Sequence, residues 1–518
     1  MRKMAYTMAK ALPRLGLLLA VVLAFGMDAA SASPPASDAV VSTHAGRLQG
    51  ADVGDGIRAY LGIPYARPPL GALRWKAPEP ASPWQDTRAA RDFSPACMQP
   101  ASPWDPTAEP VPQSEDCLYL NVWTPAQTSS ARLPVMVWFH GGGLMVGSGS
   151  ESETQGTALS RKGVIVVTVN YRLGPLGYLV LRDLNKESPH KTSGNYGLLD
   201  QIAALKWVKQ NIAAFGGDPD NVTIFGFSAG STSVSALQAS PLAKGLFHKA
   251  IGESTAQMNP RAGIWHLRTF AEAENYGEEY KKSLGAANLA DLRALPAAKL
   301  VQSPYKFWLV EGDGYALPQE VHDIFAEGKQ APIPVLAGAT ANEETTLATA
   351  DMLSWLHPRT AQDEADFKRL YGEQGAHNNR SVSDVILWQM REWVRLNSLR
   401  QGRSYLYYFT RSPPSPRPGL GAYHGAEVPY VFETLDAYPW RWTAEDRKLA
   451  DIVSSYWTNF ARTGDPNGMG LPYWPAYGSG KIMELSSSPA AITMPRQEAL
   501  NVLDGYFARE QAATPKAK

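Results

Sequence analysis

Several short stretches of the chain are almost continuously apolar, a pattern that predicts strands buried on both faces. The longest cover residues 133–139 and 163–169, and both are rich in β-branched side chains. Shorter runs of the same kind cover 222–225, 333–337 and 405–409. Strands with one exposed face alternate between apolar and polar residues, whereas strands covered by helices on both faces do not. The runs therefore predict a mostly parallel sheet in the interior.

Helical periodicity occupies the intervals between these runs. One amphipathic helix is predicted before residue 215, because apolar residues recur there at spacings of three and four. They are Leu198, Ile202, Leu205, Val208 and Ile212. The pair Gly216 and Gly217 ends this helix, and a second helix is predicted over 385–399.

The alternation of strand and helix patterns along most of the chain is typical of one α/β domain. We expect residues 33–511 to form this domain and residues 512–518 to be a frayed tail. The predicted architecture is a large, mostly parallel central sheet covered by helices on both faces.

The first 32 residues predict a signal peptide. A basic start with Arg2 and Lys3 precedes an apolar run over 15–25, and Ala30-Ser31-Ala32 is a small-residue cleavage site. A membrane anchor is the alternative, but the run is too short to span a bilayer with tilt. We expect a mature chain that begins at Ser33, is exported to the periplasm or the medium, and makes no stable membrane insertion.

The charge balance argues against polyanionic partners. The 518 residues include 49 basic and 49 acidic side chains, and 44% of them are hydrophobic, enough for a large core. Removal of the leader would leave 45 basic and 48 acidic residues, because the leader carries four basic residues and one acidic. A near-neutral chain without basic runs is not expected to bind nucleic acid or anionic membranes.

The chain has two cysteines, Cys97 and Cys117. In an exported protein, one even pair predicts one disulfide. Two cysteines cannot make a structural zinc site alone, and no HExxH, CxxC or clustered histidine pattern supplies one. We therefore expect no metal and no cofactor.

A serine stands between two glycines at the end of the predicted strand 222–225. Residues 226–230 read Gly-Phe-Ser-Ala-Gly, and apolar positions at Val234 and Leu237 predict a helix directly afterwards. In a nucleophile elbow, this strand–turn–helix context presents the serine above the strand ends, at a helix N-terminus. An inert serine in a glycine turn is the alternative, and the context favours Ser228 as a nucleophile.

A glycine run after strand 133–139 predicts an oxyanion hole. Residues 140–143 read His-Gly-Gly-Gly, and glycines after a strand let backbone N–H groups turn inward. We expect the N–H groups of Gly142, Gly143 and Ala229 to hold the oxyanion. A merely flexible glycine loop is the alternative. His140 is expected to support the loop.

A nucleophilic serine also needs a general base and a carboxylate that orients it. In this type of hydrolase the acid and then the histidine follow the serine along the chain. Strand 333–337 leads to two candidate acids, Glu343 and Glu344. Three histidines remain for the base, and a glycine-flanked loop after strand 405–409 favours the last of them. They are His357, His377 and His424.

Taken together, the chain resembles the type-B carboxylesterase family, α/β-hydrolases that include cholinesterases and bacterial nitrobenzyl-ester hydrolases. The resemblance covers nearly the whole mature chain and rests on several motifs. These motifs are residues 61–66, 73–75, 115–122, 170–172, 195–201, 215–230 and 463–467.

The resemblance implies an α/β-hydrolase fold and specific residue roles. Ser228 matches the family nucleophile, His424 the family histidine, and Glu343 stands at the position of the acid. The pair Cys97–Cys117 matches the first disulfide of the family. Ser254 matches a serine that supports the triad from behind.

Two positions depart from the family pattern. Phe227 replaces a glutamate beside the nucleophile, which makes cationic choline-type substrates less favourable. Glu344 replaces the glycine that usually follows the acid, so two adjacent carboxylates compete for the role of orienting His424.

The predicted function is hydrolysis of small-molecule carboxylic esters through a Ser-His-Glu triad and an acyl-enzyme. A lipase or an amidase using the same residues is the alternative within this class. A non-catalytic binding protein on the same fold would be expected to lack Ser228, His424 or the glycine loop. Four tryptophans could line an aromatic gorge or belong to the core: Trp104, Trp355, Trp388 and Trp393.

Overall fold

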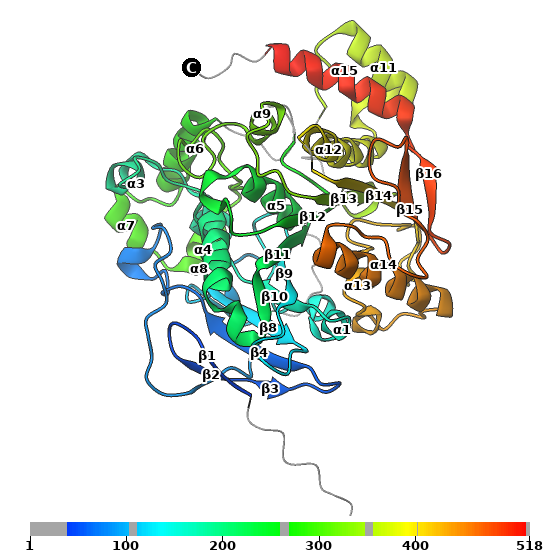
Figure 1. The fold of residues 1–518 in the computed structure, drawn as a ribbon. Helices are drawn as coiled ribbons and strands as arrows, with labels where there is room; N and C mark the ends of the chain where they lie inside the picture. Colours follow the sequence, from blue (N-terminus) through cyan, green and yellow to red (C-terminus); the bar gives the residue numbers. More distant parts are fainter. Residues whose placement is uncertain (1–38, 103–110, 259–268, 348–355, 401, 514–518) are drawn as a thin grey trace, which may run out of the picture. The chain divides into compact units, whose positions relative to one another are not determined.

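A sheet of eleven strands runs through the protein, and its middle strands are parallel (Figure 1). The spatial order is β16-β15-β14-β13-β12-β11-β9-β10-β8-β4-β3. From β15 to β10 all pairings are parallel, whereas the outer pairings at each edge are antiparallel. The strands are β3 Ala51–Asp52, β4 Arg58–Pro64, β8 Tyr119–Thr124, β9 Leu133–Phe139, β10 Ile165–Val169, β11 Gly217–Phe227, β12 Lys249–Glu253, β13 Val335–Thr340, β14 Ser404–Phe409, β15 Lys481–Leu485 and β16 Ala490–Thr493.

The computed structural model describes residues 39–102, 111–258, 269–347, 356–400 and 402–513. Within them, two small sheets accompany the large one, and their strands are β1 Val40–Ser42, β2 Arg47–Gln49 and β5 Arg88–Ala89, then β6 Ala96–Cys97 and β7 Gln113–Ser114. The predicted signal peptide over residues 1–32 and the candidate gorge residues Trp104 and Trp355 lie outside the described residues.

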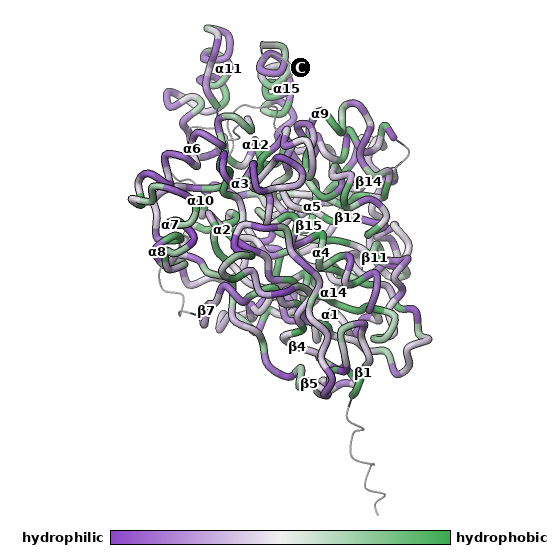
Figure 2. Tube along the Cα trace, turned by 90° about the vertical axis from the view of Figure 1, so that its left-hand side faces the viewer, coloured by the Kyte–Doolittle hydropathy of each residue, from purple (hydrophilic) through white to green (hydrophobic). Residues whose placement is uncertain are grey.

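Helices connect the strands and cover the sheet. They are α1 Thr157–Arg161, α2 Gly174–Tyr178, α3 Arg182–Glu187, α4 Tyr196–Asn211, α5 Ala229–Ala239, α6 Phe270–Ser283, α7 Leu289–Ala294, α8 Ala297–Val301, α9 Val321–Ala326, α10 Glu344–Leu347, α11 Ala361–Tyr371, α12 Arg380–Ser398, α13 Val428–Val431, α14 Ala444–Thr463 and α15 Gln497–Ala513. In Figure 2 the chain around β11 and β12 is coloured largely hydrophobic, whereas α6 and α11 are largely hydrophilic.

Alternate residues of the central strands face two separate cores. On β9, Val135 and Val137 pack into the core that includes α4, α5 and α12, whereas Met136 and Trp138 pack into the core of α13 and α14. Since side chains alternate between the two faces of a strand, continuous apolar runs follow directly from coverage on both sides. The predicted mostly parallel sheet with helices on both faces is therefore confirmed.

The predicted elements are present with shifted ends. Strand 133–139 is β9, and the other four predicted strands correspond to β10, β11, β13 and β14. The helix that carries Leu198 is α4, and Gly216 terminates it after a short 3-10 turn with φ of 83°. The helix predicted from 385 begins at Arg380. α15 continues through Ala513.

The sequence pattern missed β12 and α14. β12 has charged residues at both ends, Lys249 and Glu253, although both are buried. Glu253 is tolerated there because the indole N–H of Trp457 on α14 donates to its Oε1 at 2.8 Å. A buried charge with a partner from a distant helix leaves no local signal in the sequence.

The predicted disulfide is present between Cys97 and Cys117, whose Cα atoms are 5.0 Å apart. Across the part of the chain that the structure describes, no helix is long and apolar enough to cross a bilayer. The domain limits at residues 33 and 511 stay predictions.

Candidate active site

Ser228 occupies a sharp turn between β11 and α5. Its backbone has φ of 55° and ψ of −125°, a conformation that L-residues rarely adopt. The turn is held by the N–H of Ser228, which donates to the carbonyl of Glu253 at 2.8 Å. A Cβ at Gly230 would overlap the carbonyl oxygen of Phe139, so α5 can begin this close to β9 only with glycine there.

Three side chains from three loops form one hydrogen-bonded series at the carboxyl ends of the strands. Oγ of Ser228 lies 2.8 Å from Nε2 of His424, and Nδ1 of His424 lies 2.5 Å from Oε2 of Glu343. A carboxylate only accepts, so Nδ1 carries the proton and Nε2 is free to accept from the serine. Glu343 is fully buried and Ser228 is 8% exposed. This geometry is that of a nucleophile, a base and an orienting acid.

Of the alternatives for the base, the structure brings only His424 to the serine. His377 is exposed at the end of a 3-10 helix, and His357 is exposed with its backbone N–H donating to the hydroxyl of Tyr506.

The glycine loop follows β9 directly. Gly142 and Gly143 have φ of 96° and 62°, which only glycine adopts without strain. Burial lowers the pKa of His140 to about 4, and its neutral ring stacks on Tyr171 at 4.3 Å. The hydroxyl of Tyr171 donates to the carbonyl of His140 at 2.7 Å, so this histidine supports the loop.

The disulfide loop is hydrogen-bonded to the chain that follows the glycine loop. The side chain of Gln99 donates to the carbonyl of Gly147 at 3.0 Å and accepts from its N–H at 2.8 Å. Gln99 lies two residues from Cys97, so the disulfide tethers the support of the glycine loop.

Phe227 fills the position where the resemblance expects a glutamate. Its ring lies 4.5 Å from the His424 ring. A Cβ at Gly425 would lie 2.7 Å from this ring, and one at Gly141 would lie 2.9 Å from it. The aromatic ring therefore packs between the glycine loop and the histidine loop, and position 227 next to the serine carries no carboxylate.

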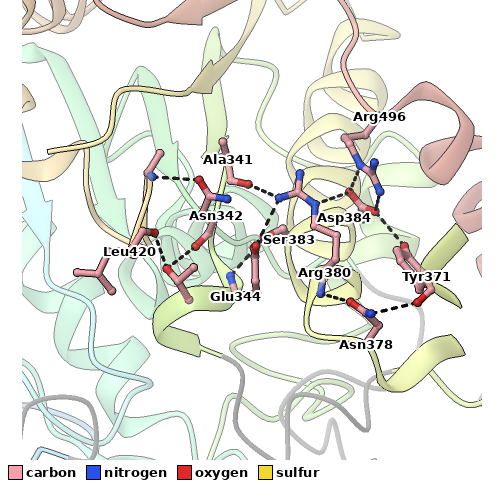
Figure 3. A network of polar contacts seen from close by, with 12 residues as sticks. Ala341, Asn342, Glu344, Tyr371, Asn378, Arg380, Ser383, Asp384, Leu420 and Arg496 are labelled. Atoms are coloured by element: carbon pink, nitrogen blue, oxygen red, sulfur yellow. Dashed lines mark hydrogen bonds and ion pairs between the residues drawn. The ribbon is translucent and has the colours of Figure 1, made fainter. Parts of the chain in front are cut away.

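The side chain of Glu344 meets α12 (Figure 3). The hydroxyl of Ser383 donates to its Oε2, and the guanidinium of Arg380 lies 3.5 Å from its Oε1. Both partners belong to α12. Of the two adjacent glutamates, Glu343 alone contacts the histidine.

Two further carboxylates are buried behind the series. Ser254 donates to Oε1 of Glu427 at 3.0 Å, and Tyr407 donates to the same oxygen at 3.1 Å. Burial, followed by the charge of Glu343, raises the pKa of Glu427 to about 8. Burial and the charge of Glu427 raise the pKa of Glu253 in the same way. Ser254 thus contacts Glu427 and none of the three predicted triad side chains.

Sequence reasoning missed Glu253, Glu427 and Arg380. Glu427 follows His424 by three residues, a spacing that carried a usable signal. Glu253 lies on β12 and Arg380 on α12, and neither residue had a sequence signal that linked it to the site. The tryptophans Trp388 and Trp393 belong to the core: their indole N–H groups donate to Asp504 and Gln238, at 2.8 Å each.

Comparison with known proteins identifies close relatives. The model described as the Carboxylesterase family matches residues 37–393 and 368–503. The para-nitrobenzyl esterase of Bacillus subtilis is 38% identical over 85% of this chain and 92% of its own. The fumonisin B1 esterase of Sphingopyxis macrogoltabida is 36% identical, with 86% of each chain covered. A carboxylesterase structure from Geobacillus stearothermophilus superposes with a TM-score of 0.77 at 33% identity, covering 89% of this chain and 99% of its own. The predicted α/β-hydrolase fold is therefore confirmed.

We expect Glu343→Gln and Glu344→Gln to differ sharply in activity. An amide at position 343 no longer favours the imidazolium and disturbs the tautomer of His424, so kcat should fall by about 10³- to 10⁴-fold. Glutamine at 344 can still accept from Ser383 and Arg380, so most activity should remain. Steady-state kinetics of both purified variants checks this. Loss of activity in Glu344→Gln with retention in Glu343→Gln would reverse the assignment of the acid.

We expect Glu427 to make the protein less stable as the pH rises. Its folded pKa of about 8 lies above 4.5, the ordinary pKa of a glutamate. The folded state therefore binds more protons between these values, and the free energy of unfolding falls across this window and levels off above it. Urea unfolding between pH 5 and 8 should show a shallower decline in Glu427→Gln. The exposed Glu364→Gln is the control, and equal slopes in both variants would contradict the prediction.

Proposed function

We propose, starting from the fact that the chain belongs to the carboxylesterase family and is a carboxylic ester hydrolase, that Ser228, His424 and Glu343 are its catalytic triad. The observation that carries the proposal is the series of contacts from Oγ of Ser228 through His424 to Glu343, at 2.8 and 2.5 Å. The esterase relatives argue against the non-catalytic binding protein.

Acylation begins when Oγ of Ser228 attacks the carbonyl carbon of the ester. Nε2 of His424 takes the hydroxyl proton, and the Glu343 carboxylate stabilises the imidazolium that results. The N–H groups of Gly142, Gly143 and Ala229 hold the negative oxygen of the tetrahedral intermediate. One such donor is typically worth about 2.7–4 kcal/mol of transition-state stabilisation.

Collapse of the intermediate breaks the bond to the alcohol. The imidazolium of His424 gives its proton to the leaving oxygen, and the acyl group stays on Ser228. A water molecule then repeats the attack with His424 as the base, and the acid is released. The serine proton leaves with the alcohol and His424 passes a proton of the water to Oγ of Ser228, so the cycle consumes only ester and water.

The surroundings of the serine favour uncharged esters. Phe227 presents an aromatic ring where the family pattern expects a carboxylate, and this ring packs on His424 at 4.5 Å. A cationic alcohol group would find no negative partner at this position. We therefore favour neutral small-molecule esters over choline-type esters as substrates.

We expect the purified enzyme to hydrolyse p-nitrophenyl esters of short and medium acyl chains, and Ser228→Ala to abolish this activity. Removal of the nucleophile costs about 10⁶-fold in kcat in related chemistry. The series should run from acetyl to palmitoyl, with an anilide and a thiocholine ester beside it.

Each kind of substrate in this series tests one proposed function. A maximum at long acyl chains would identify a lipase, and turnover of the anilide an amidase. Preference for the thiocholine ester would contradict the proposed role of Phe227. Equal hydrolysis by folded Ser228→Ala would refute the triad.

The protein is proposed to act after export. The N-terminal pattern over residues 1–32 predicts a signal peptide, and disulfides such as Cys97–Cys117 persist in oxidising compartments. These two features support a periplasmic or secreted enzyme.

Cleavage after Ala32 should give a mature protein that begins at Ser33. N-terminal sequencing of the protein from the periplasmic and medium fractions checks the site. Ala32→Arg should block processing, because the cleavage site requires small residues. An intact Met1 in exported wild-type protein would contradict the prediction.

A further inference from the structure

The carboxylate of Glu343 has few hydrogen-bond partners of its own. Its Oε2 faces His424, and its Oε1 accepts from the backbone N–H of Thr340 at 2.7 Å. The charge of Glu343 in turn helps to raise the pKa of Glu427, the next carboxyl group behind it. The position of Glu343 therefore depends on the backbone of residues 340–345, which we call the acid loop.

One side of the acid loop is tied to the histidine loop (Figure 3). The N–H of Asn342 donates to the carbonyl of Ala422 at 2.9 Å, and the N–H of Ala422 returns to Oδ1 of Asn342 at 3.1 Å. The hydroxyl of Thr345 donates to the carbonyl of Leu420 at 2.8 Å. These bonds set the separation between the loops that carry Glu343 and His424.

The other side of the acid loop is held by one cation, Arg380, at the start of α12. Its Nη1 donates to the carbonyl of Ala341 at 2.6 Å and lies 3.5 Å from Oε1 of Glu344. Its Nη2 donates to the hydroxyl of Tyr408 on β14 at 3.3 Å. Arg380 thus contacts the acid loop before and after Glu343, and it also contacts β14, the strand that leads to the histidine loop.

Arg380 is itself fixed by a second ion pair. Its Nε lies 4.0 Å from Oδ1 of the buried Asp384, one helical turn further along α12. Arg496, before α15, donates to both oxygens of Asp384 at 2.9 and 2.7 Å, and Tyr371 donates at 3.0 Å. The guanidinium therefore lies beside a buried carboxylate that is itself held by hydrogen bonds, which suits it to hold a backbone in place.

We propose that Arg380 is a positioning residue for the Glu343–His424 pair, acting through the carbonyl of Ala341 and the carboxylate of Glu344. Glu344, where the family resemblance expects glycine, is the anchor that lets Arg380 hold the loop from both sides. The role deepens the proposed function and rests on it, because it requires Glu343 to be the acid.

Arg380→Met should lower kcat by about 10- to 100-fold, because a small displacement of Glu343 misaligns the base. KM should stay within about twofold, since Arg380 is remote from the substrate. A carboxylate that lies farther from His424 stabilises the imidazolium less, so the acidic limb of the kcat/KM profile should move to lower pH. The other acidic groups of the site, Glu253 and Glu427 behind the acid and Glu153 near Tyr423, are present in both wild type and variant.

Two companion variants separate positioning from general stability. Arg380→Lys keeps the charge but loses the forked geometry, so it should shift kcat and the acidic limb in the same direction by less. Arg395→Met removes another ion-paired arginine of α12, which pairs with Glu392 at 2.7 Å, and should change neither. The low-field proton resonance of the His424–Glu343 hydrogen bond should move or broaden in Arg380→Met, less in Arg380→Lys, and not in Arg395→Met.

The outcomes distinguish this role from the triad itself. Folded Arg380→Met with wild-type kcat and an unmoved acidic limb overturns the positioning role. A fall in kcat that Arg395→Met matches, or that a smaller folded fraction explains, also overturns the positioning role. If Arg380→Met does not fold, a wild-type profile in Arg380→Lys overturns it instead. Wild-type activity in Glu343→Gln would refute the proposed triad, whatever the arginine variants do.

Discussion

The close approach of α5 to the end of β9 is the constraint on which the rest of the site depends. Gly230 lies against the carbonyl of Phe139 with no room for a Cβ, and a Cβ at Gly141 would lie 2.9 Å from the Phe227 ring. This packing forces Ser228 into a left-handed backbone conformation, secured by the carbonyl of Glu253. The glycine loop and the serine are thus placed side by side by one backbone contact, before any side chain of the acid or the histidine takes part.

The sequence predicted those parts of the molecule whose physical cause is local. Apolar runs located the strands that meet the elbow and the acid, and glycines marked the turns at Ser228 and at Gly142. It missed β12, whose buried Glu253 has its partner on α14, and it missed Arg380, whose partner is the carbonyl of Ala341. Neither partner is near in sequence. The residues alone could not decide whether Glu343 or Glu344 is the acid. The two side chains diverge because Glu344 meets Ser383 on α12, whereas Glu343 meets His424.

Burial sorts three chemically identical side chains into different states. Among the described residues Glu253 and Glu427 have no cationic partner. Burial raises the pKa of both carboxyl groups, and that of Glu427 reaches about 8. Glu343 is just as buried, yet it faces the one ring that becomes positive during the proposed reaction. Of the three buried glutamates, the proposed acid is thus the one placed to stabilise an imidazolium.

The three loops of the site are far apart along the chain: Ser228 is 196 residues from His424, and Glu343 is 81 from it. During synthesis the serine therefore leaves the ribosome long before its base exists, and β14 must pair with β13 before the histidine loop has a fixed place. A nascent or truncated chain without the histidine loop is consequently inactive. Esters inside the producing cell would meet a competent enzyme only once almost the whole polypeptide had been made and folded.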